Sequence, residues 1–166
     1  MRQTITIRSF EPANYPAVRD IYQQGINTGN ATFQTKVKTW HQWNNSMLSC
    51  CRLVAIDKQE VLGWAALSAV STREVYQGVA EVSVYVAEHA QGKGVGQILL
   101  SNLVTASENN NIWMLQASIF PENTASIALH KKNGFVPLGI REKIAQLNGQ
   151  WRDVIFVQRR SEIVGI

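Results

Sequence analysis

The fold of this chain is decided by residues 81–96, EVSVYVAEHAQGKGVG. The first six residues of this stretch alternate between valine and the residues Glu81, Ser83 and Tyr85. Alternation with β-branched residues predicts a β-strand, in which successive side chains point to opposite faces. The expected strand therefore carries a carboxylate and a phenol on the same face, shortly before a glycine-rich loop.

Three glycines, Gly92, Gly94 and Gly96, end this stretch where a helical pattern begins. Apolar residues from Val95 to Leu103 recur at helical spacing and predict an amphipathic helix. The first N–H groups of a helix lack intrahelical partners, and the helix dipole is positive there. Glycine lets an anion approach such amides closely. The junction therefore predicts a phosphate site, although a simple helix-entry turn has the same short pattern.

Two common phosphate loops do not match this junction. The lysine loop of nucleotide-binding proteins requires Ser or Thr after Gly92-Lys93, where this chain has Gly94. The dinucleotide pattern G-x-G-x-x-G fails because the third glycine follows too soon. Residues 91–96, QGKGVG, instead fit the pattern Q/R-x-x-G-x-G/A. This pattern resembles the pyrophosphate loop of the GNAT acyl-CoA-dependent N-acetyltransferases.

The composition is that of one globular domain covering residues 1–166, with 45% hydrophobic and 17% charged residues. No apolar run approaches the roughly 20 residues that cross a bilayer. The N-terminus lacks the apolar core of a signal peptide, so we expect a cytoplasmic protein without a membrane partner. The only cysteines, Cys50 and Cys51, are adjacent, which suits neither a structural disulfide nor a metal site. We expect buried, reduced thiols and no metal.

The net charge of +4 has three possible explanations. Nucleic acid, an anionic cofactor and a simple solvated basic surface all fit this charge. The basic residues are scattered, apart from the pairs Lys131-Lys132 and Arg159-Arg160. The scatter argues against a nucleic-acid partner, which we do not expect, and leaves both the anionic cofactor and the solvated surface open.

The remaining periodicities predict seven strands and four helices. Expected are a strand over 4–8, a helix from Pro12 ended by Gly25 and Gly29, a helix over 39–49, strands over 52–57, 61–70 and 81–86, the helix after the glycine loop, a strand over 113–119, a helix over 124–132, and strands over 135–144 and 151–159. This order predicts an α/β (α+β) fold with a mixed central sheet and helices on both faces.

The helix expected over 124–132 carries a second set of candidate residues. Asn123, Ser126 and His130 are spaced so that they share one polar stripe. The other stripe is apolar and is expected to pack on the sheet: Ala125, Ala128 and Leu129. The polar stripe suits the amide, hydroxyl or phosphate groups of a ligand. Alternatively, it is a solvent face with Asn123 or Thr124 as the N-cap.

Residues 123–135 have the pattern N-x-x-S-x-x-L-H-x-x-x-G-F and resemble the second conserved stretch of the GNAT fold. With the glycine loop, the resemblance covers nearly the whole chain. It is closest to the phosphinothricin and methionine sulfone/sulfoximine acetyltransferase group. The features shared with that group are Glu81 before S-V-Y-V, the loop Arg73-x-x-Tyr76 and the strand WRDV at 151–154.

The resemblance implies that acetyl-CoA is the co-substrate. In this family, the strand before the glycine loop splays from its neighbour and its backbone binds the pantetheine arm, while the loop amides bind the pyrophosphate. The cofactor-binding residues implied here are Val84, Tyr85, Val86, Gln91, Gly92, Lys93, Gly94, Val95, Gly96, Gln97, Asn123 and Ser126.

The resemblance also implies direct attack of a primary amine on the thioester. Because an alkylammonium must first lose a proton, a general base is required, and Glu81 is the candidate, directly or through water. A surface or ion-paired glutamate is the alternative. His130 stands where many GNATs have a tyrosine acid, as it does in the phosphinothricin group. It could protonate the thiolate, bind substrate, or be a structural, hydrogen-bonded histidine.

Arg73 is the candidate for recognising the substrate, because a guanidinium can bind a carboxylate through two hydrogen bonds. Tyr76, Phe33 and Tyr85 are expected as pocket walls. A solvated Arg73 and a Phe33 in the core are the alternatives. We expect the substrate to be an amino acid or an analogue of the phosphinothricin or methionine sulfone type, and the resemblance implies a homodimer. Acetylation of protein N-termini or lysines, or acyl-CoA or nucleic-acid binding without catalysis, would be different functions for the same chain.

Overall fold

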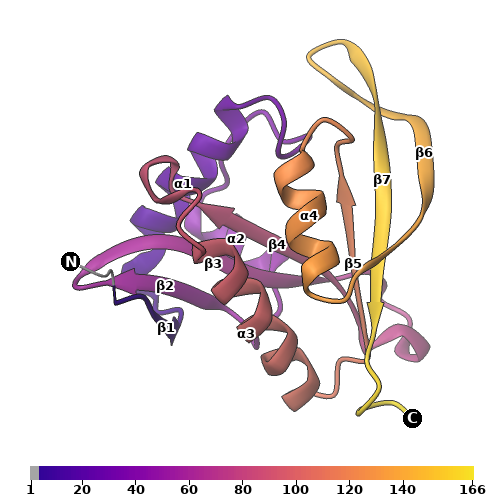
Figure 1. Ribbon diagram of the computed structural model, residues 1–166, viewed down its shortest axis with the longest axis horizontal. Helices are drawn as coiled ribbons and strands as arrows, with labels where there is room; N and C mark the ends of the chain where they lie inside the picture. Colours follow the sequence, from indigo (N-terminus) through magenta and orange to yellow (C-terminus); the bar gives the residue numbers. More distant parts are fainter. Residues whose placement is uncertain (1–3) are drawn as a thin grey trace.

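A seven-stranded sheet forms the centre of the computed structural model, which describes residues 4–166 (Figure 1). The strands lie in the order β1-β2-β3-β4-β5-β7-β6, and in the described residues only β4 and β5 are parallel neighbours. The strands are β1 Thr6–Ser9, β2 Leu53–Asp57, β3 Glu60–Ala69, β4 Val79–Val86, β5 Met114–Ile119, β6 Val136–Leu147 and β7 Gln150–Arg160. The predicted mixed sheet of seven strands is confirmed.

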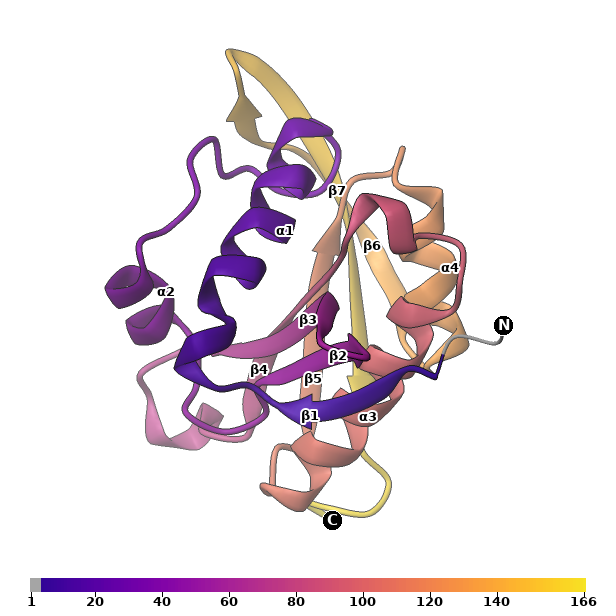
Figure 2. The same cartoon turned by 90° about the vertical axis from the view of Figure 1, so that its left-hand side faces the viewer.

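Helices cover both faces of the sheet (Figure 2). Helices α1 and α2 lie on one face, and α3 and α4 lie on the other. The helices are α1 Tyr15–Asn27, α2 Trp40–Ser46, α3 Val95–Asn109 and α4 Thr124–Lys132, with short 3-10 turns η1 Pro12–Asn14, η2 Glu74–Tyr76 and η3 Glu88–Ala90. The predicted order of strands and helices is also confirmed.

The hydrophobic core is formed largely by the apolar stripes expected on the two longest helices. Val18 of α1 and Leu99 and Leu103 of α3 are fully buried. They pack with the centre of β3, where Ala66 and Leu67 are also fully buried. Burial of this apolar surface is the main stabilising contribution to such a fold.

Gly25 lies inside α1 and does not end it, which corrects the prediction. The helix continues to Asn27, and a Cβ at position 25 would lie only 2.7 Å from Cε1 of Tyr85. This glycine is therefore required by the close packing of Tyr85 on α1. Helix α2 is also shorter than expected, ending at Ser46. Its N-cap is Thr39, whose hydroxyl accepts a hydrogen bond from the Gln42 amide.

Helix α4 presents its small residues differently from the prediction. Ala125 and Ala128 are exposed, and His130 is the buried residue of this helix. The expectation that both alanines pack on the sheet is therefore wrong. Both alanines instead line the large cavity described below, where small side chains leave room.

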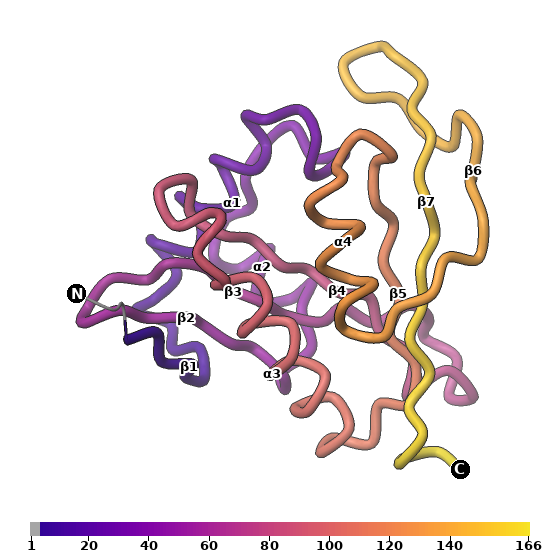
Figure 3. The backbone as a smooth tube through the Cα atoms, in the orientation of Figure 1, coloured from indigo at the N-terminus to yellow at the C-terminus, as the bar shows by residue number. Residues whose placement is uncertain are grey.

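Strands β4 and β5 diverge after a short parallel contact, as the paths in Figure 3 show. They pair from Val79 to Glu81 only, and the last pair is Glu81 with Gln116. Beyond Glu81, β4 continues to Val86 with β3 as its only strand neighbour among residues 4–166, while β5 continues beside β7. The sheet therefore forks at Glu81.

None of the helices in residues 4–166 is long and apolar enough to cross a membrane. Cys50 and Cys51 are free thiols, of which only Cys51 is buried. The first predicted strand begins at Thr6 and not at Thr4. Residues 1–3, which belong to the segment where no signal peptide is expected, lie outside the described residues.

Candidate active site

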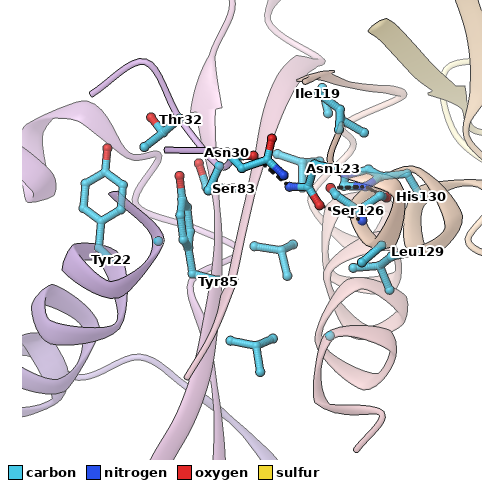
Figure 4. Close-up of a pocket in the computed structure, with 18 of the residues that line it drawn as sticks. Tyr22, Asn30, Thr32, Ser83, Tyr85, Ile119, Asn123, Ser126, Leu129 and His130 are labelled. Carbon is cyan, nitrogen blue, oxygen red and sulfur yellow. Dashed lines mark hydrogen bonds between the residues drawn. The ribbon is translucent and has the colours of Figure 1, made fainter. Parts of the chain in front are cut away.

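A cavity of about 1070 Å³ opens at the fork between β4 and β5. Its lining comes from α1 and the loop that follows, β3, β4, the glycine loop and α4. Figure 4 shows Tyr22 and Tyr85 on one side of it and Ser126 and His130 of α4 on the other. The predicted residues that line this cavity are Phe33, Glu81, Val84, Tyr85, Val86, Gln91, Gly92, Gly94, Val95, Gly96, Gln97, Asn123, Ser126 and His130.

The glycine loop ends at the N-terminus of α3, as an anion site requires. Gly94 is the N-cap and has φ +82°, a left-handed conformation that glycine adopts without strain. Gly96 lies within the helix, where a Cβ would be 3.2 Å from Cδ2 of Leu129 on α4. The third glycine therefore allows close packing of α3 and α4 and is not part of the loop. Lys93 is exposed and does not belong to the cavity lining.

The backbone of β4 beyond Glu81 offers unpaired polar groups to the cavity. Val84 pairs with Ala65 of β3, so one edge of β4 is occupied. On the other edge, no strand pairing to β5 continues past Glu81 in the described residues. Alternate N–H and C=O groups of β4 therefore face the cavity without a strand partner. Such an edge can bind an extended chain that carries amides.

Glu81 occupies the closed end of the fork. Burial raises the pKa of its carboxyl group, while a hydrogen bond from Gln116 and the charge of Arg141 oppose this shift. The carboxyl group therefore holds its proton more strongly than an exposed glutamate. A raised pKa moves a carboxylate towards the range in which it works as a base near neutral pH.

Tyr85 forms a wall of the cavity and is not a proton donor. Its ring stacks on Trp64 with centroids 5.0 Å apart and meets Tyr22 edge-on. Burial raises the pKa of Tyr85, so its hydroxyl stays protonated at neutral pH. Phe33 lies on another wall and meets Phe120 edge-on at 4.9 Å. It also packs on a small apolar cluster, so it lies in the cavity and against the core at once.

His130 is only 4% exposed, and its two ring nitrogens have different surroundings. Nδ1 lies 2.7 Å from the Ser126 carbonyl oxygen, while Nε2 is buried without a hydrogen-bond partner in the described residues. Because a carbonyl only accepts, Nδ1 carries the proton in the neutral ring. Burial lowers the pKa of His130, although the bond to Ser126 opposes this shift. The ring is therefore neutral, with a bare accepting Nε2.

Asn123 connects the start of α4 to the loop after α1. Its Oδ1 accepts a hydrogen bond from the Ser126 amide at 3.2 Å, which makes it the N-cap. Its Nδ2 donates to the Asn30 carbonyl oxygen at 3.1 Å, across 93 positions of sequence (Figure 4). The N-cap part of the alternative is therefore correct, but the polar stripe is not a solvent face, because His130 is buried and all three residues line the cavity.

Arg73 and Tyr76 lie outside the cavity. They are exposed on the turn η2, where the Arg73 guanidinium stacks over the Tyr76 ring at 5.3 Å. The expectation that Tyr76 is a wall of the same pocket as Phe33 and Tyr85, with Arg73 binding the substrate there, therefore does not hold within a single chain. The reason is local: the Arg73 guanidinium packs on the Tyr76 ring of the same turn, so the two side chains contact each other and not the cavity.

Many further cavity residues were not anticipated from the sequence, among them Asn30, Lys38 and Trp64. Asn30 Oδ1 and Trp64 Nε1 are buried without hydrogen-bond partners in the described residues. Lys38 precedes α2 and adds a cation to the lining. Each comes from a different segment, and no local pattern marks any of them. Among residues 4–166, no three His, Cys, Asp or Glu side chains are grouped so that they could hold a metal ion.

Comparison with known sequences gives one family. Residues 15–135 match the model of the Acetyltransferase (GNAT) family. A phosphinothricin N-acetyltransferase from Alcaligenes faecalis is 31% identical over 95% of this chain and 83% of its own length. An L-methionine sulfoximine/L-methionine sulfone acetyltransferase from Pseudomonas aeruginosa is 31% identical over 92% of each chain. These matches confirm the predicted resemblance.

Solved structures share the same fold. A GNAT superfamily phosphinothricin acetyltransferase from Sinorhizobium meliloti, solved with acetyl-CoA, has a TM-score of 0.87 at 28% identity, covering 98% of this chain and 91% of its own. A structure named ribosomal-protein-alanine N-acetyltransferase, from Brucella melitensis, has a TM-score of 0.85 at 30% identity, covering 94% and 99%. The neighbours thus carry names for both small-molecule and protein substrates.

Proposed function

This chain belongs to the acetyltransferase (GNAT) family of acetyl-CoA-dependent acyltransferases, and we propose that it acetylates the primary amine of an amino acid or a close analogue. The analogues are of the phosphinothricin, methionine sulfone or methionine sulfoximine type, because relatives with those names match nearly the full chain. Glu81 acts as the general base, directly or through one water molecule.

The observation that carries the proposal is the position of Glu81 at the fork. Its strand pairing with Gln116 is the last one before β4 and β5 separate. A base at this point lies where an acyl group delivered along the unpaired edge of β4 would end. Burial raises the pKa of the carboxyl group, which favours proton uptake from an ammonium group.

The chain's own groups fit acetyl-CoA. The free edge of β4 from Val84 to Val86 suits the amides of the pantetheine arm, and the amides of residues 91–97 suit the pyrophosphate. Asn123 and Ser126 lie beside that path on α4. When bound, acetyl-CoA supplies the thioester whose carbonyl carbon the amine attacks; the C–S bond breaks, and the leaving thiolate takes up the proton that the nitrogen gives up on becoming an amide.

Glu81 accepts the proton that the attacking amine must lose. An N–H group on the free edge of β4 can stabilise negative charge on the carbonyl oxygen. We assign His130 a hydrogen-bonding role and not that of the acid, because its neutral ring has no proton on Nε2 to give. Phe33 and Tyr85 act as walls that exclude water from the reacting groups.

A protein substrate is the second candidate function. It is favoured by the Brucella melitensis neighbour, whose name describes acetylation of a ribosomal protein. Against it, the cavity at Glu81 has Phe33, Tyr85 and Trp64 as walls, which suits a small amine better than a chain. The two functions differ in the acceptor only, so one acceptor screen separates them.

We extend the proposal to a homodimer formed through β6. This strand is the edge of the sheet, and Val136, Leu138 and Ile140 on it are all more than half exposed. Exposed apolar edge strands associate readily, and natural proteins usually cover them. A second copy of the chain would cover this edge.

The test of the function is an acceptor screen with detection of released thiol. Amino acids, methionine sulfone, phosphinothricin, polyamines and a peptide with N-terminal alanine are each offered with acetyl-CoA. We expect transfer to amino acids or their analogues. Transfer to the peptide alone would replace the proposal with the protein-substrate function. No thiol release with any amine would leave only a binding module.

The cofactor assignment is tested by calorimetric titration with acetyl-CoA. Gly94→Trp should lose measurable binding, because φ +82° strains a side chain there and the indole would cover the helix N-terminus. The matched control is Gly149→Trp, at a glycine with φ +80° and equally open space in the β6–β7 turn. Equal binding by both variants would rule out the loop as the cofactor site.

A further inference from the structure

In the described part of the chain, one amino group, that of Lys38, lines the cavity next to α2. The charged side chains that line the cavity are Lys38, Glu81 and Lys132. Lys132 lies next to Asn133, whose side chain exchanges hydrogen bonds with Gln97 in the first turn of α3. It therefore belongs to the cofactor end. Lys38 precedes α2, on the other face of the sheet (Figure 2).

The chain holds Lys38 in place without neutralising it. The Lys38 Nζ donates to Ser46 Oγ at 3.2 Å, and Ser46 Oγ donates to the Trp43 carbonyl oxygen at 2.9 Å. The Lys38 carbonyl accepts from the Tyr15 hydroxyl, which fixes the backbone. None of the ion pairs among residues 4–166 includes Lys38. An ammonium group with one neutral partner has donors to spare.

A second donor in the same region also lacks an acceptor. Trp64 lines the cavity, and its ring lies 5.6 Å from that of Trp43, to which the hydrogen-bond chain from Lys38 leads. The Trp64 Nε1–H is buried and has no partner in the described residues. Because this N–H is buried, the Lys38 ammonium group is the donor of the two that a ligand in the cavity can reach. A half-buried ammonium group with unused N–H donors, lining a cavity, suits an oxyanion.

We propose that Lys38 binds an anionic group of the amine substrate, a carboxylate or a phosphinate, while Glu81 faces the amine. The inference rests on the proposed function and adds the residue that selects a zwitterionic substrate over a simple amine. It moves that role from Arg73, which lies outside the cavity, to a residue inside it. Lys38 touches substrate and takes no part in proton transfer.

The test compares Lys38→Met with the wild type on three substrates. Methionine sulfone has only an α-carboxylate anion, its α-amide has none, and phosphinothricin has both a carboxylate and a phosphinate. We expect the KM for an anionic substrate to rise at least tenfold in Lys38→Met, since a hydrogen bond to a charged group is lost. The kcat should change less than threefold, and the amide should be acetylated equally by both enzymes. Lys38→Arg should restore most of the affinity.

The pattern over the substrates identifies the bound group. Weaker binding of both methionine sulfone and phosphinothricin assigns the α-carboxylate, and weaker binding of phosphinothricin alone assigns the phosphinate. The control is Lys36→Met, an exposed lysine of the same loop that does not line the cavity. It should behave as the wild type.

The inference is overturned if Lys38→Met leaves every KM unchanged, or raises the KM of the amide as much as that of the acid. An effect of Arg73→Met alone would return the role to Arg73. Titration with acetyl-CoA should give the same affinity for Lys38→Met and the wild type, which shows that the variant is folded. Absence of transfer to any amine by the wild type would contradict the proposed function instead, so the two failures are distinct.

Discussion

His130 is a buried histidine whose neutral state has a measurable consequence for stability. Burial lowers its pKa in the folded chain, whereas the unfolded chain has the ordinary value of about 6.5. Below that pH the unfolded state binds a proton that the folded state does not. Stability contributed by the neutral ring is therefore lost as pH falls from about 6.5 towards the lowered pKa.

We predict that His130→Gln reduces the pH dependence of the Tm. In the wild type the Tm should fall between pH 7.5 and 5.5, and in the variant this part of the fall should be smaller. The control is His41→Gln, at an exposed position, which should keep the slope of the wild type. Equal slopes for the wild type and His130→Gln would contradict a buried, neutral ring.

Single residues were predictable where one element places them together. Asn123, Ser126 and His130 follow from helical spacing, and Glu81 and Tyr85 from strand spacing, so all five line the cavity as expected. Arg73 was wrongly predicted to lie in the pocket because its loop has neither helical nor strand periodicity. Lys38 was missed because its proximity to the fork arises only when α2 packs on the sheet.

The exposed edge strand β6 has its own test. We predict that the chain is a dimer of twice 18.6 kDa, and that Leu138→Glu with Ile140→Glu shifts it to a monomer. Both positions are more than half exposed, so the charges should disturb association and not folding. Light scattering coupled to gel filtration gives the mass. The control is Ile163→Glu, which is exposed near the C-terminus.

A monomeric wild type at tens of micromolar would contradict this use of β6, as would a double variant that stays dimeric. A loss of the folded state in the double variant would be visible by circular dichroism and would call for the single substitutions.

Elements were predictable in number and order, and less so in their limits. Period-two and helical patterns depend on burial of one face, which the sequence records directly. Gly25 was predicted to end the helix because glycine is common at helix ends. In the structure, a glycine is needed there because the ring of Tyr85, on a distant strand, packs closely against it. The faces of α4 were assigned wrongly because small apolar residues at helical spacing have the pattern of a core stripe. Ala125 and Ala128 instead line an open cavity, which leaves them exposed.

At the scale of the whole molecule, the fork in the sheet joins two faces into one site. The glycine loop leads into α3, on one face, and Lys38 lies beside α2, on the other. Only where β4 and β5 part can a group from one side meet a group from the other. The strand order alone does not reveal where the parallel pairing stops. In the sequence, the fork was expected only through the family resemblance.

The most direct test of this account is the pH dependence of kcat/KM for the wild type and Glu81→Gln with one amino-acid substrate. The ratio of the two values cancels the ionisation of the amine, which both enzymes share. Removing a general base typically lowers the rate by about 10²–10⁴-fold. Glu162→Gln, at an exposed position, is the control and should behave as the wild type.

We predict that the ratio of wild type to Glu81→Gln is large and constant at high pH. Below the pKa of Glu81, which burial raises above its ordinary value of 4.5, the ratio should fall tenfold for each pH unit. A ratio that stays the same at every pH, or a Glu81→Gln variant within threefold of the wild type, would remove Glu81 from catalysis and contradict the account.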